Sequence, residues 1–305
     1  MTSIIDTLFN AMGGLDIHAE LLLAILIITS GIVIFTIMAV NTLFSVYFER
    51  KVSAFMQDRL GPMEVGIFGF KGGKKYWGGI GQIIADGLKL LTKEDIIPKS
   101  ADKILMIMAP FIIFTGALLT FIAIPLSENL VVSDFNIGIF YIVAMSSVGV
   151  VGIILAGWSS NNKWSLYGSM RAAAQIVSYE IPIGLSLLLV VLVVGSLHLG
   201  DIVAWQAEHR WFILHSPFSF LAFFIYYIST VAETNRTPFD IPEAESELVA
   251  GWMTEYSGFR WSLFFLSEYA NMLIVSIVAS IVFLGGWLSP FQLFNIFPES
   301  WLILD

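Results

Sequence analysis

The chain has 305 residues, of which 57% are hydrophobic and only 13% are charged, with a mean hydropathy of +0.83 and a formal net charge of −9. Soluble globular domains carry about a quarter charged residues, so this composition excludes that class and indicates an integral membrane protein. The chain contains no cysteine, which excludes a disulfide framework, a thiolate zinc site and a Cys-ligated iron–sulfur cluster within it.

Several stretches are apolar enough to cross a membrane, because a spanning helix needs about 20 mostly apolar residues. In chain order these predicted spans are 21–48, 104–126, 137–156, 172–197, 211–232 and 261–286. The first is preceded by no Lys or Arg and is too long for a signal peptide. Because no internal repeat or linker interrupts the pattern, we predict a single all-α membrane domain over 1–305 with about six transmembrane helices.

The basic residues are distributed unevenly between the two sides of these spans. The loops 49–103, 157–171 and 233–260 hold every Lys and Arg of the chain except Arg210. The positive-inside rule therefore places these three loops on the inner face and the N-terminus outside.

The first inner loop contains an amphipathic segment at 78–95, which we expect to form a helix lying along the membrane surface. Its apolar face and its polar face consist of different residues: Ile80, Ile83, Ile84, Leu88 and Leu91 on one, Gln82, Asp86, Lys89 and Lys93 on the other. The segment could be an interfacial anchor and nothing more, but an acid near its middle, Asp86, favours a functional role.

Two carboxylates fall inside predicted spans. Glu180 lies nine residues after Arg171 and Glu268 lies seven after Trp261, which is about 14 and 10 Å along a helix. A charge at such depth is unfavourable, so each side chain must face the protein interior, pair, or stay protonated. Either acid alone could serve only a helix-to-helix hydrogen bond. Pro182 follows Glu180 closely and can kink this span, which would leave room for water.

An acidic loop, AETNRTPFDIPEAESELVAG at 232–251, separates the last two predicted spans. A charge run usually forms a solvated face. Apolar residues are interleaved here, however, and would not favour free solvation: Phe239, Ile241, Leu248, Val249 and Trp252.

Three histidines lie within one outer segment: His198, His209 and His215. They could form a weak metal site, but solvated loop histidines are the better interpretation, and we predict no metal centre.

Three stretches of the sequence resemble those of one known family. They are ERKVSAFMQDRLGP (49–62), GWSSNNKWSLYGSMRAAAQIVSYEIP (157–182) and AETNRTPFDIPEAESELVAGWMTEYSG (232–258). They are similar to the signature stretches of the H subunits of proton-translocating NADH-quinone oxidoreductases, the respiratory complex I, and the likeness covers about 44–286. All three occur in order and on the same predicted face.

This resemblance implies a subunit at the junction of the membrane arm and the peripheral arm, forming the quinone (ubiquinone or a relative) tunnel and the first part of an acidic proton-coupling path. It implies no catalytic redox residue in this chain and no cofactor of its own: NADH, FMN and the iron–sulfur clusters would lie on partner subunits, among them those completing the quinone head site. Other membrane-arm subunits and lipid would be further partners. The location would be the bacterial inner membrane, or the mitochondrial inner membrane.

The resemblance also implies roles by position. The expected proton path comprises Glu49, Glu180, Glu233, Glu243, Glu245, Glu247 and Glu268. The expected quinone-binding residues are Arg50, Arg59, Asp86, Arg236, Phe239 and Asp240. Because the glutamates of EAESE are closely spaced, their titrations should be coupled.

Two alternatives stay open. The anchor subunits of membrane-bound nickel-iron hydrogenases and of ferredoxin- or F420-dependent relatives carry a related RxPFD stretch, but there it continues with a sequence resembling NPTTHLEL. An independent ion-coupled transporter is the alternative from another class, although transporters commonly show paired repeats, which are not evident here.

The end of the chain differs from the family. Family members continue with two further spans where this chain ends in PESWLILD, for which we expect a truncated product or an incomplete record.

Overall fold

The computed structural model describes residues 19–66, 78–128, 130–243 and 245–288, and the side chains of all of these except 19–24, 26, 245 and 246. Within this part the chain is helical, with one isolated β-bridge between Ser127 and Leu130 and no strand. The helices are α2 (Ala19–Met56), α3 (Gly81–Thr92), α4 (Lys103–Ile122), α5 (Gly138–Ser159), α6 (Lys163–Val194), α7 (Leu199–Glu208), α8 (Pro217–Glu233), α9 (Glu245–Leu248) and α10 (Gly258–Phe283).

The predicted all-α membrane fold is confirmed. Part of α2 (Ile27–Met56) and the whole of α4, α5, α6 and α10 are long and apolar enough to cross a membrane. The remaining predicted span, 211–232, is shorter than expected, because 212–214 form a 3₁₀ turn and α8 begins only at Pro217. The 17 residues of α8 reach the lower limit for a spanning helix.

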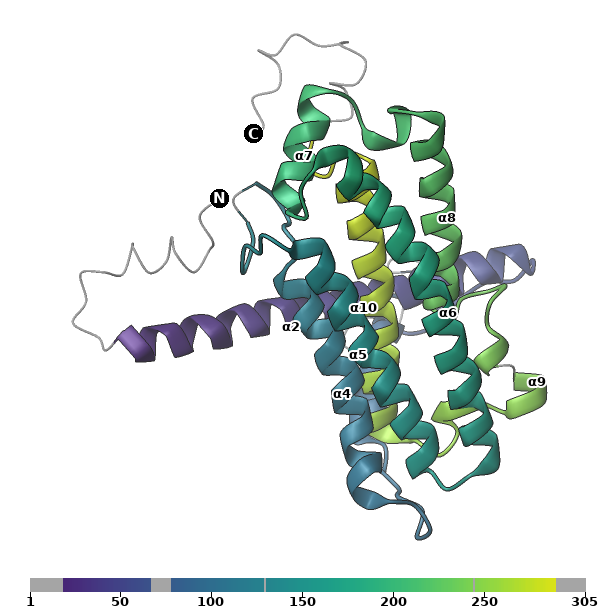
Figure 1. Ribbon diagram of the computed structural model, residues 1–305. Coiled ribbons are helices and arrows are strands. Elements are labelled where there is room, and N and C mark those ends of the chain that lie inside the picture. Colours follow the sequence, from purple (N-terminus) through teal and green to yellow (C-terminus); the bar gives the residue numbers. More distant parts are fainter. Residues whose placement is uncertain (1–18, 67–77, 129, 244, 289–305) are drawn as a thin grey trace.

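The first long helix differs from the others in length and direction. Figure 1 shows α2 lying crosswise to α4, α5, α6, α8 and α10, which run alongside one another. Its 38 residues make it about 57 Å long, and a helix longer than the hydrocarbon core can be accommodated by tilting. The predicted end at 48 was too early, since α2 continues to Met56 and carries Glu49 and Arg50 on a helix instead of a loop.

The helix α6 likewise begins earlier than predicted, at Lys163 instead of 172, so most of the expected loop 157–171 is helical. Asn162 caps its start by accepting a hydrogen bond from the Trp164 backbone N–H at 3.0 Å. The helix runs through Pro182 and ends at Gly195, whose left-handed conformation (φ +82°) glycine adopts without strain.

Two apolar clusters hold the bundle together. One joins α4, α5, α6, α8 and α10 around fully buried side chains such as Phe212 and Phe283. The other lies at the opposite end of the bundle, where Trp252 packs edge-to-face on Phe264 with ring centroids 4.6 Å apart. This second cluster includes Trp252, Met253 and Tyr256, so the segment that joins the acidic loop to α10 is packed against the helices rather than freely solvated.

The end of the acidic loop approaches α6 closely. A Cβ at Gly168 would lie 2.6 Å from the Gly251 Cα, and the Ser165 hydroxyl donates to the Trp252 carbonyl at 3.1 Å. Leu248 and Trp252 are accordingly buried, whereas Ile241 and Val249 are 56% and 63% exposed. The segment before α4 meets the end of α5, where the Asp102 N–H donates to the Ser159 carbonyl at 2.9 Å.

The predicted amphipathic helix is present as α3, which packs against α2 and α10. Its attachment to α10 is reinforced just beyond its end, where the buried Arg260 guanidinium donates from Nε to Asp95 at 2.6 Å. Leu88 and Leu91 are exposed, as expected for a helix that lies along a membrane surface.

Candidate functional site

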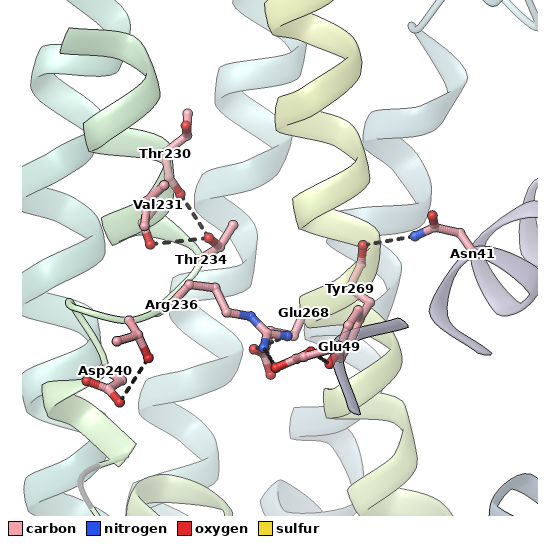
Figure 2. A network of polar contacts seen from close by, with 10 residues as sticks. Asn41, Glu49, Thr230, Val231, Thr234, Arg236, Asp240, Glu268 and Tyr269 are labelled. Carbon is pink, nitrogen blue, oxygen red and sulfur yellow. Dashed lines mark hydrogen bonds and ion pairs between the residues drawn. The ribbon is translucent and has the colours of Figure 1, made fainter. Parts of the chain in front are cut away.

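The candidate site is centred on Arg236, which follows α8 in the acidic loop. Figure 2 shows its guanidinium extending towards side chains from two other helices. Arg236 Nη1 lies 3.1 Å from Glu49 Oε1 of α2, and Arg236 Nη2 lies 3.0 Å from Glu268 Oε1 of α10. The contact with Glu268 is an ion pair without a directed hydrogen bond, and Arg236 Nε has no hydrogen-bond partner among the described residues. One cation thus bridges two carboxylates from distant parts of the chain.

Tyr269 completes this cluster. Its hydroxyl donates a short hydrogen bond to Glu49, and its ring lies under the guanidinium, with Arg236 Cζ 4.5 Å from the ring centroid. Burial alone would lower the pKa of Arg236, but the charge of Glu268, the Tyr269 hydroxyl and the charge of Glu49 outweigh it and raise that pKa above its ordinary value. Arg236 is therefore a permanent positive charge at the centre of this site.

A cavity of about 630 Å³ opens beside the cluster. It is lined by three arginines and three glutamates, together with apolar and aromatic side chains: Val46, Glu49, Arg50, Ser53, Arg59, Pro62, Arg236, Glu243, Met253, Trp261, Phe265, Glu268 and Tyr269. We call this the polar cavity. A volume in this range suits a small organic ligand, and the cations and hydroxyl can stabilise negative charge on it.

A second cavity, of about 290 Å³, lies between α2, α3 and the start of α10. Its lining is mostly apolar and includes Phe35, Leu43, Ile83, Leu90, Leu91, Phe259 and Leu266. We call this the apolar cavity. It shares part of its wall with the polar cavity, namely Val46, Arg50, Pro62, Trp261 and Phe265.

An ion pair stands where the two cavities meet. Arg50 donates a short hydrogen bond to Asp86, which also accepts from the Gln82 amide at 2.9 Å. Lys89 Nζ lies 3.7 Å from Asp86 as well. Burial raises the pKa of Asp86, but the hydrogen bonds from Arg50 and Gln82 and the nearby positive charges outweigh it, so that pKa falls below its ordinary value. Asp86 is ionised and joins α3 to α2.

Two of the predicted acids lie apart from this site. Glu180 and Glu233 line a small cavity of about 30 Å³ between α5, α6, α8 and α10, which we call the acid cavity. Ser147 donates to Glu180 Oε1 at 2.9 Å. The other lining residues are Ser146, Tyr226 and apolar side chains, so no cation among the described residues lines this space.

The remaining predicted residues are distributed between the polar cavity and the surface. Glu243 lines the polar cavity, where burial raises its pKa, Arg236 opposes that shift and Asp240 adds to it. Glu247 pairs with Arg171 at 2.8 Å on the exposed surface. Asp240 is exposed and accepts from the Thr237 hydroxyl at 3.4 Å, and the Phe239 ring packs on Tyr179.

Neither Phe239 nor Asp240 is among the described residues that line the two larger cavities. The side chain of Glu245 lies outside the described part of the chain.

Sequence reasoning did not single out two polar residues of this region, Tyr269 and Gln175. Gln175 Nε2 donates to the acidic loop, reaching the Ala232 carbonyl, Asn235 Oδ1 and the Phe239 carbonyl at 2.8, 3.0 and 2.8 Å. A signal was present for Gln175, since a polar side chain in an apolar helix usually faces a hydrogen-bonding partner. For Tyr269 the only hint was its position next to Glu268.

The histidines form no metal site in the part of the chain that the structure describes, which contains no group of three or more metal-ligating side chains. His198 lies between Asp134 and Asp201, at 2.6 and 3.0 Å, while His209 stacks on Trp205 with ring centroids 4.4 Å apart. Burial lowers the pKa of His198, but hydrogen bonds and charges of the two aspartates outweigh it and raise that pKa.

Comparison with known proteins gives a consistent result. The model of the family described as NADH dehydrogenase matches residues 29–304. The H subunit of the NADH-quinone oxidoreductase of Chlorobaculum parvum is 49% identical over 290 residues, covering 94% of this chain and 77% of that protein. The corresponding subunit of Bacteroides fragilis is 50% identical over 85% of this chain and 69% of that protein. That of Anaeromyxobacter dehalogenans is 46% identical over 90% of this chain and 62% of that protein.

Proposed function

Because this chain belongs to the NADH dehydrogenase family, we propose that, as a membrane subunit of NADH-quinone oxidoreductase, it forms the quinone tunnel and the first part of the proton-coupling path. The single observation that carries this proposal is a pair of cavities with a shared wall and opposite character. A quinone has a polar head and a long apolar tail. The polar cavity suits the head, and the apolar cavity beside α3 suits the tail on its way in from lipid.

The polar cavity can respond to quinone chemistry. Reduction to quinol takes two electrons and two protons, and the electrons would come from an iron–sulfur cluster on a peripheral subunit. Negative charge developing on the head would be stabilised by Arg236, Arg50 and Arg59, in the manner of preorganised cations around a reacting oxygen. Such charge would compete with Glu49 and Glu268 for Arg236, and so change the balance of charge in the cluster.

The acid cavity supplies the next step of the path. Glu233 ends α8 and stands three residues before Arg236, so the same turn carries an acid of one cavity and a cation of the other. Glu180 faces the same small space from α6. Two ionised carboxylates are unfavourable in an apolar setting where no cation lines the space among the described residues, and a proton held between them removes that cost. We propose that charge at Arg236 controls when this proton moves on towards other membrane-arm subunits.

The partners follow from this arrangement. The inner end of the bundle, with the acidic loop and the exposed Arg171–Glu247 pair, would contact the peripheral subunits that complete the quinone head site. NADH, FMN and iron–sulfur clusters would lie on those subunits. In a bacterium the location would be the inner membrane.

Photoaffinity labelling tests the tunnel directly. The purified complex would be irradiated with a short-chain quinone that carries a photoreactive group on its tail, with and without an excess of the same quinone lacking that group. We expect protectable labelling of peptides from 42–50 and 259–266, which line the apolar cavity. Labelling confined to other parts of the chain would contradict the proposal.

Co-purification decides between the open alternatives. A tag on this chain should bring down flavin and iron–sulfur subunits with NADH:quinone activity. A nickel-iron subunit in their place would support the hydrogenase anchor, and recovery of the chain alone would support a transporter.

A further inference from the structure

The position of Arg236 depends on the turn in which α8 ends. The Asn235 N–H donates to the Ala232 carbonyl at 3.2 Å, and the Arg236 N–H donates to the Val231 carbonyl at 3.1 Å. This pair of bonds is the Schellman arrangement, which requires a left-handed residue at its turning point. Asn235 occupies that point with φ +51°, a conformation that asparagine tolerates better than most residues.

Gln175 of α6 contacts this turn at three points. The acceptors around its Nε2 are the Ala232 carbonyl inside the turn, the Asn235 side chain at its apex, and the Phe239 carbonyl beyond Arg236. An amide nitrogen has two hydrogens, so three acceptors share them. The backbone carbonyls can only accept, which fixes the orientation of the amide with its nitrogen towards the loop.

A second residue on this face of α6, Tyr179, also contacts the acidic loop. Tyr179 lies one turn after Gln175, and its ring packs edge-on against Phe239 with centroids 5.5 Å apart. Phe239 is thus fixed through its carbonyl by Gln175 and through its ring by Tyr179. The contacts of α6 with Ala232 and Asn235 precede Arg236 and those with Phe239 follow it, so the loop is held on both sides of Arg236. The Arg236 guanidinium itself pairs with Glu49 of α2 and Glu268 of α10.

We propose that Gln175 is a positioning residue for Arg236. Its amide holds 232–239 as one rigid turn, and this rigidity sets where the guanidinium meets Glu49, Glu268 and the polar cavity. The inference rests on the proposed function, since the effect of a misplaced Arg236 is measured as quinone reduction. A positioned cation is worth most when its location is held to within a fraction of an ångström, because a 1 Å error can reduce a rate about 100-fold.

The test compares variants in the whole purified complex. Gln175→Leu replaces the side chain by a slightly shorter apolar one and removes the amide. Ser178→Ala is the matched control, because Ser178 lies on the same helix, is exposed, and donates only to the Ala174 carbonyl of its own helix. Rates would be expressed per assembled complex, with NADH:ferricyanide activity as the measure of the peripheral arm. We expect Gln175→Leu to lower kcat/KM for a short-chain quinone about 10- to 100-fold and Ser178→Ala to leave it unchanged.

A double-mutant cycle separates positioning from general stability. If Gln175 acts through Arg236, the variant that combines Gln175→Leu with Arg236→Gln should be no slower than Arg236→Gln alone. Additive losses would overturn the proposal, because Gln175 would then act elsewhere. If Arg236→Gln itself leaves quinone reduction unchanged, the role of Arg236 in the proposed function fails as well. An impaired Arg236→Gln beside an unaffected Gln175→Leu would overturn only the positioning role.

A second variant, Asn235→Gly, tests the proposal if the complex that carries Gln175→Leu does not assemble. Asn235→Gly retains the left-handed turn and removes one of the acceptors of Gln175. We expect a smaller fall in kcat/KM in the same direction, again absent in an Arg236→Gln background. Normal kinetics in Asn235→Gly would overturn the proposal in that case.

Discussion

The polar cavity and the acid cavity are both lined by glutamates, but they differ in size and in charge. The polar cavity has about 630 Å³ and sets three arginines against three glutamates. The acid cavity has about 30 Å³ and holds Glu180 and Glu233 without a lining cation among the described residues. The first has room and balanced charge for a ligand, whereas the second has room only for a water molecule and favours holding a proton. Acids of one predicted path can therefore serve different steps.

The largest expected effect comes from the acid cavity. Glu180→Gln should abolish coupled proton translocation while the complex assembles, because the amide keeps the hydrogen-bonding shape beside Ser147 and cannot carry a proton. KM for quinone should stay close to the wild-type value. Proton uptake into reconstituted vesicles, measured with a pH-sensitive dye during turnover, provides the check. Full coupled turnover in this variant would show that the acid cavity is not part of the path.

Removing the charge of Arg236 from the polar cavity should act on quinone reduction itself. Arg236→Gln leaves Glu49 and Glu268 without their shared partner, and unpaired carboxylates in a partly buried site are costly. We expect kcat/KM for quinone to fall about 10- to 100-fold, which corresponds to roughly 1.4–2.7 kcal/mol. Steady-state kinetics on the purified complex measure the loss.

The second-site variant Glu268→Gln should recover part of that activity, since it removes one of the two unpaired charges. Arg236→Lys should recover less than half of the activity that Arg236→Gln loses, because a lysine ammonium is a point charge that cannot bridge two carboxylates as a guanidinium does. Recovery to the wild-type rate by lysine would argue against the bridging role.

A bulky side chain between the polar cavity and the apolar cavity should affect binding of the quinone tail more than binding of the head. Val46 lines both cavities, and Val46→Trp places a large ring between them. We expect KM for a long-tailed quinone to rise about fivefold, or roughly 1 kcal/mol, with little change for a short-chain analogue. Equal effects on both quinones would show that the apolar cavity does not accommodate the tail.

The smallest expected effect concerns Asp86 and its pH dependence. Its folded pKa lies below the ordinary value, so the contribution of the Arg50–Asp86 pair is present above that ordinary value and is lost only as the pH falls through the lowered one. The half-exposed Arg50 limits the pair to about 0–1 kcal/mol. Asp86→Asn should change KM less than fivefold, by the same factor at pH 5 and pH 8. If the change in KM caused by Asp86→Asn were larger at pH 8 than at pH 5, Asp86 would titrate between these two pH values.

The sequence was sufficient for the helical membrane fold, but two of the helices extend beyond the predicted spans. Hydropathy marks where a chain leaves lipid, and a helix can continue beyond that point. The run ERKVSAFM at 49–56 is charged at its start and still extends α2, just as Lys163 begins α6 nine residues before the predicted span. Glu49 and Arg50 were therefore expected on a loop, although the sequence pointed to both residues.

The partners of Arg236 could not be predicted from the sequence, for a different reason. Its carboxylates come from α2 and α10, and periodicity within one segment carries no information on contacts between distant segments. For Phe239 and Asp240, the neighbouring sequence suggested the quinone tunnel. In the structure Phe239 packs against α6 and Asp240 lies at the surface. Gln175 was visible only as a polar exception in an apolar helix.

The contact between α2 and the cluster also bears on how the protein is made. Glu49 precedes Arg236 by 187 positions and Tyr269 by 220. At synthesis rates of about 5–20 residues per second, Glu49 emerges from the ribosome roughly 10–40 s before its cation. During that interval neither Arg236 nor Tyr269, the partners that Glu49 has in the structure, has yet been made. The order of insertion therefore decides when this carboxylate is neutralised, and a variant that delays α10 would leave it unpaired for longer.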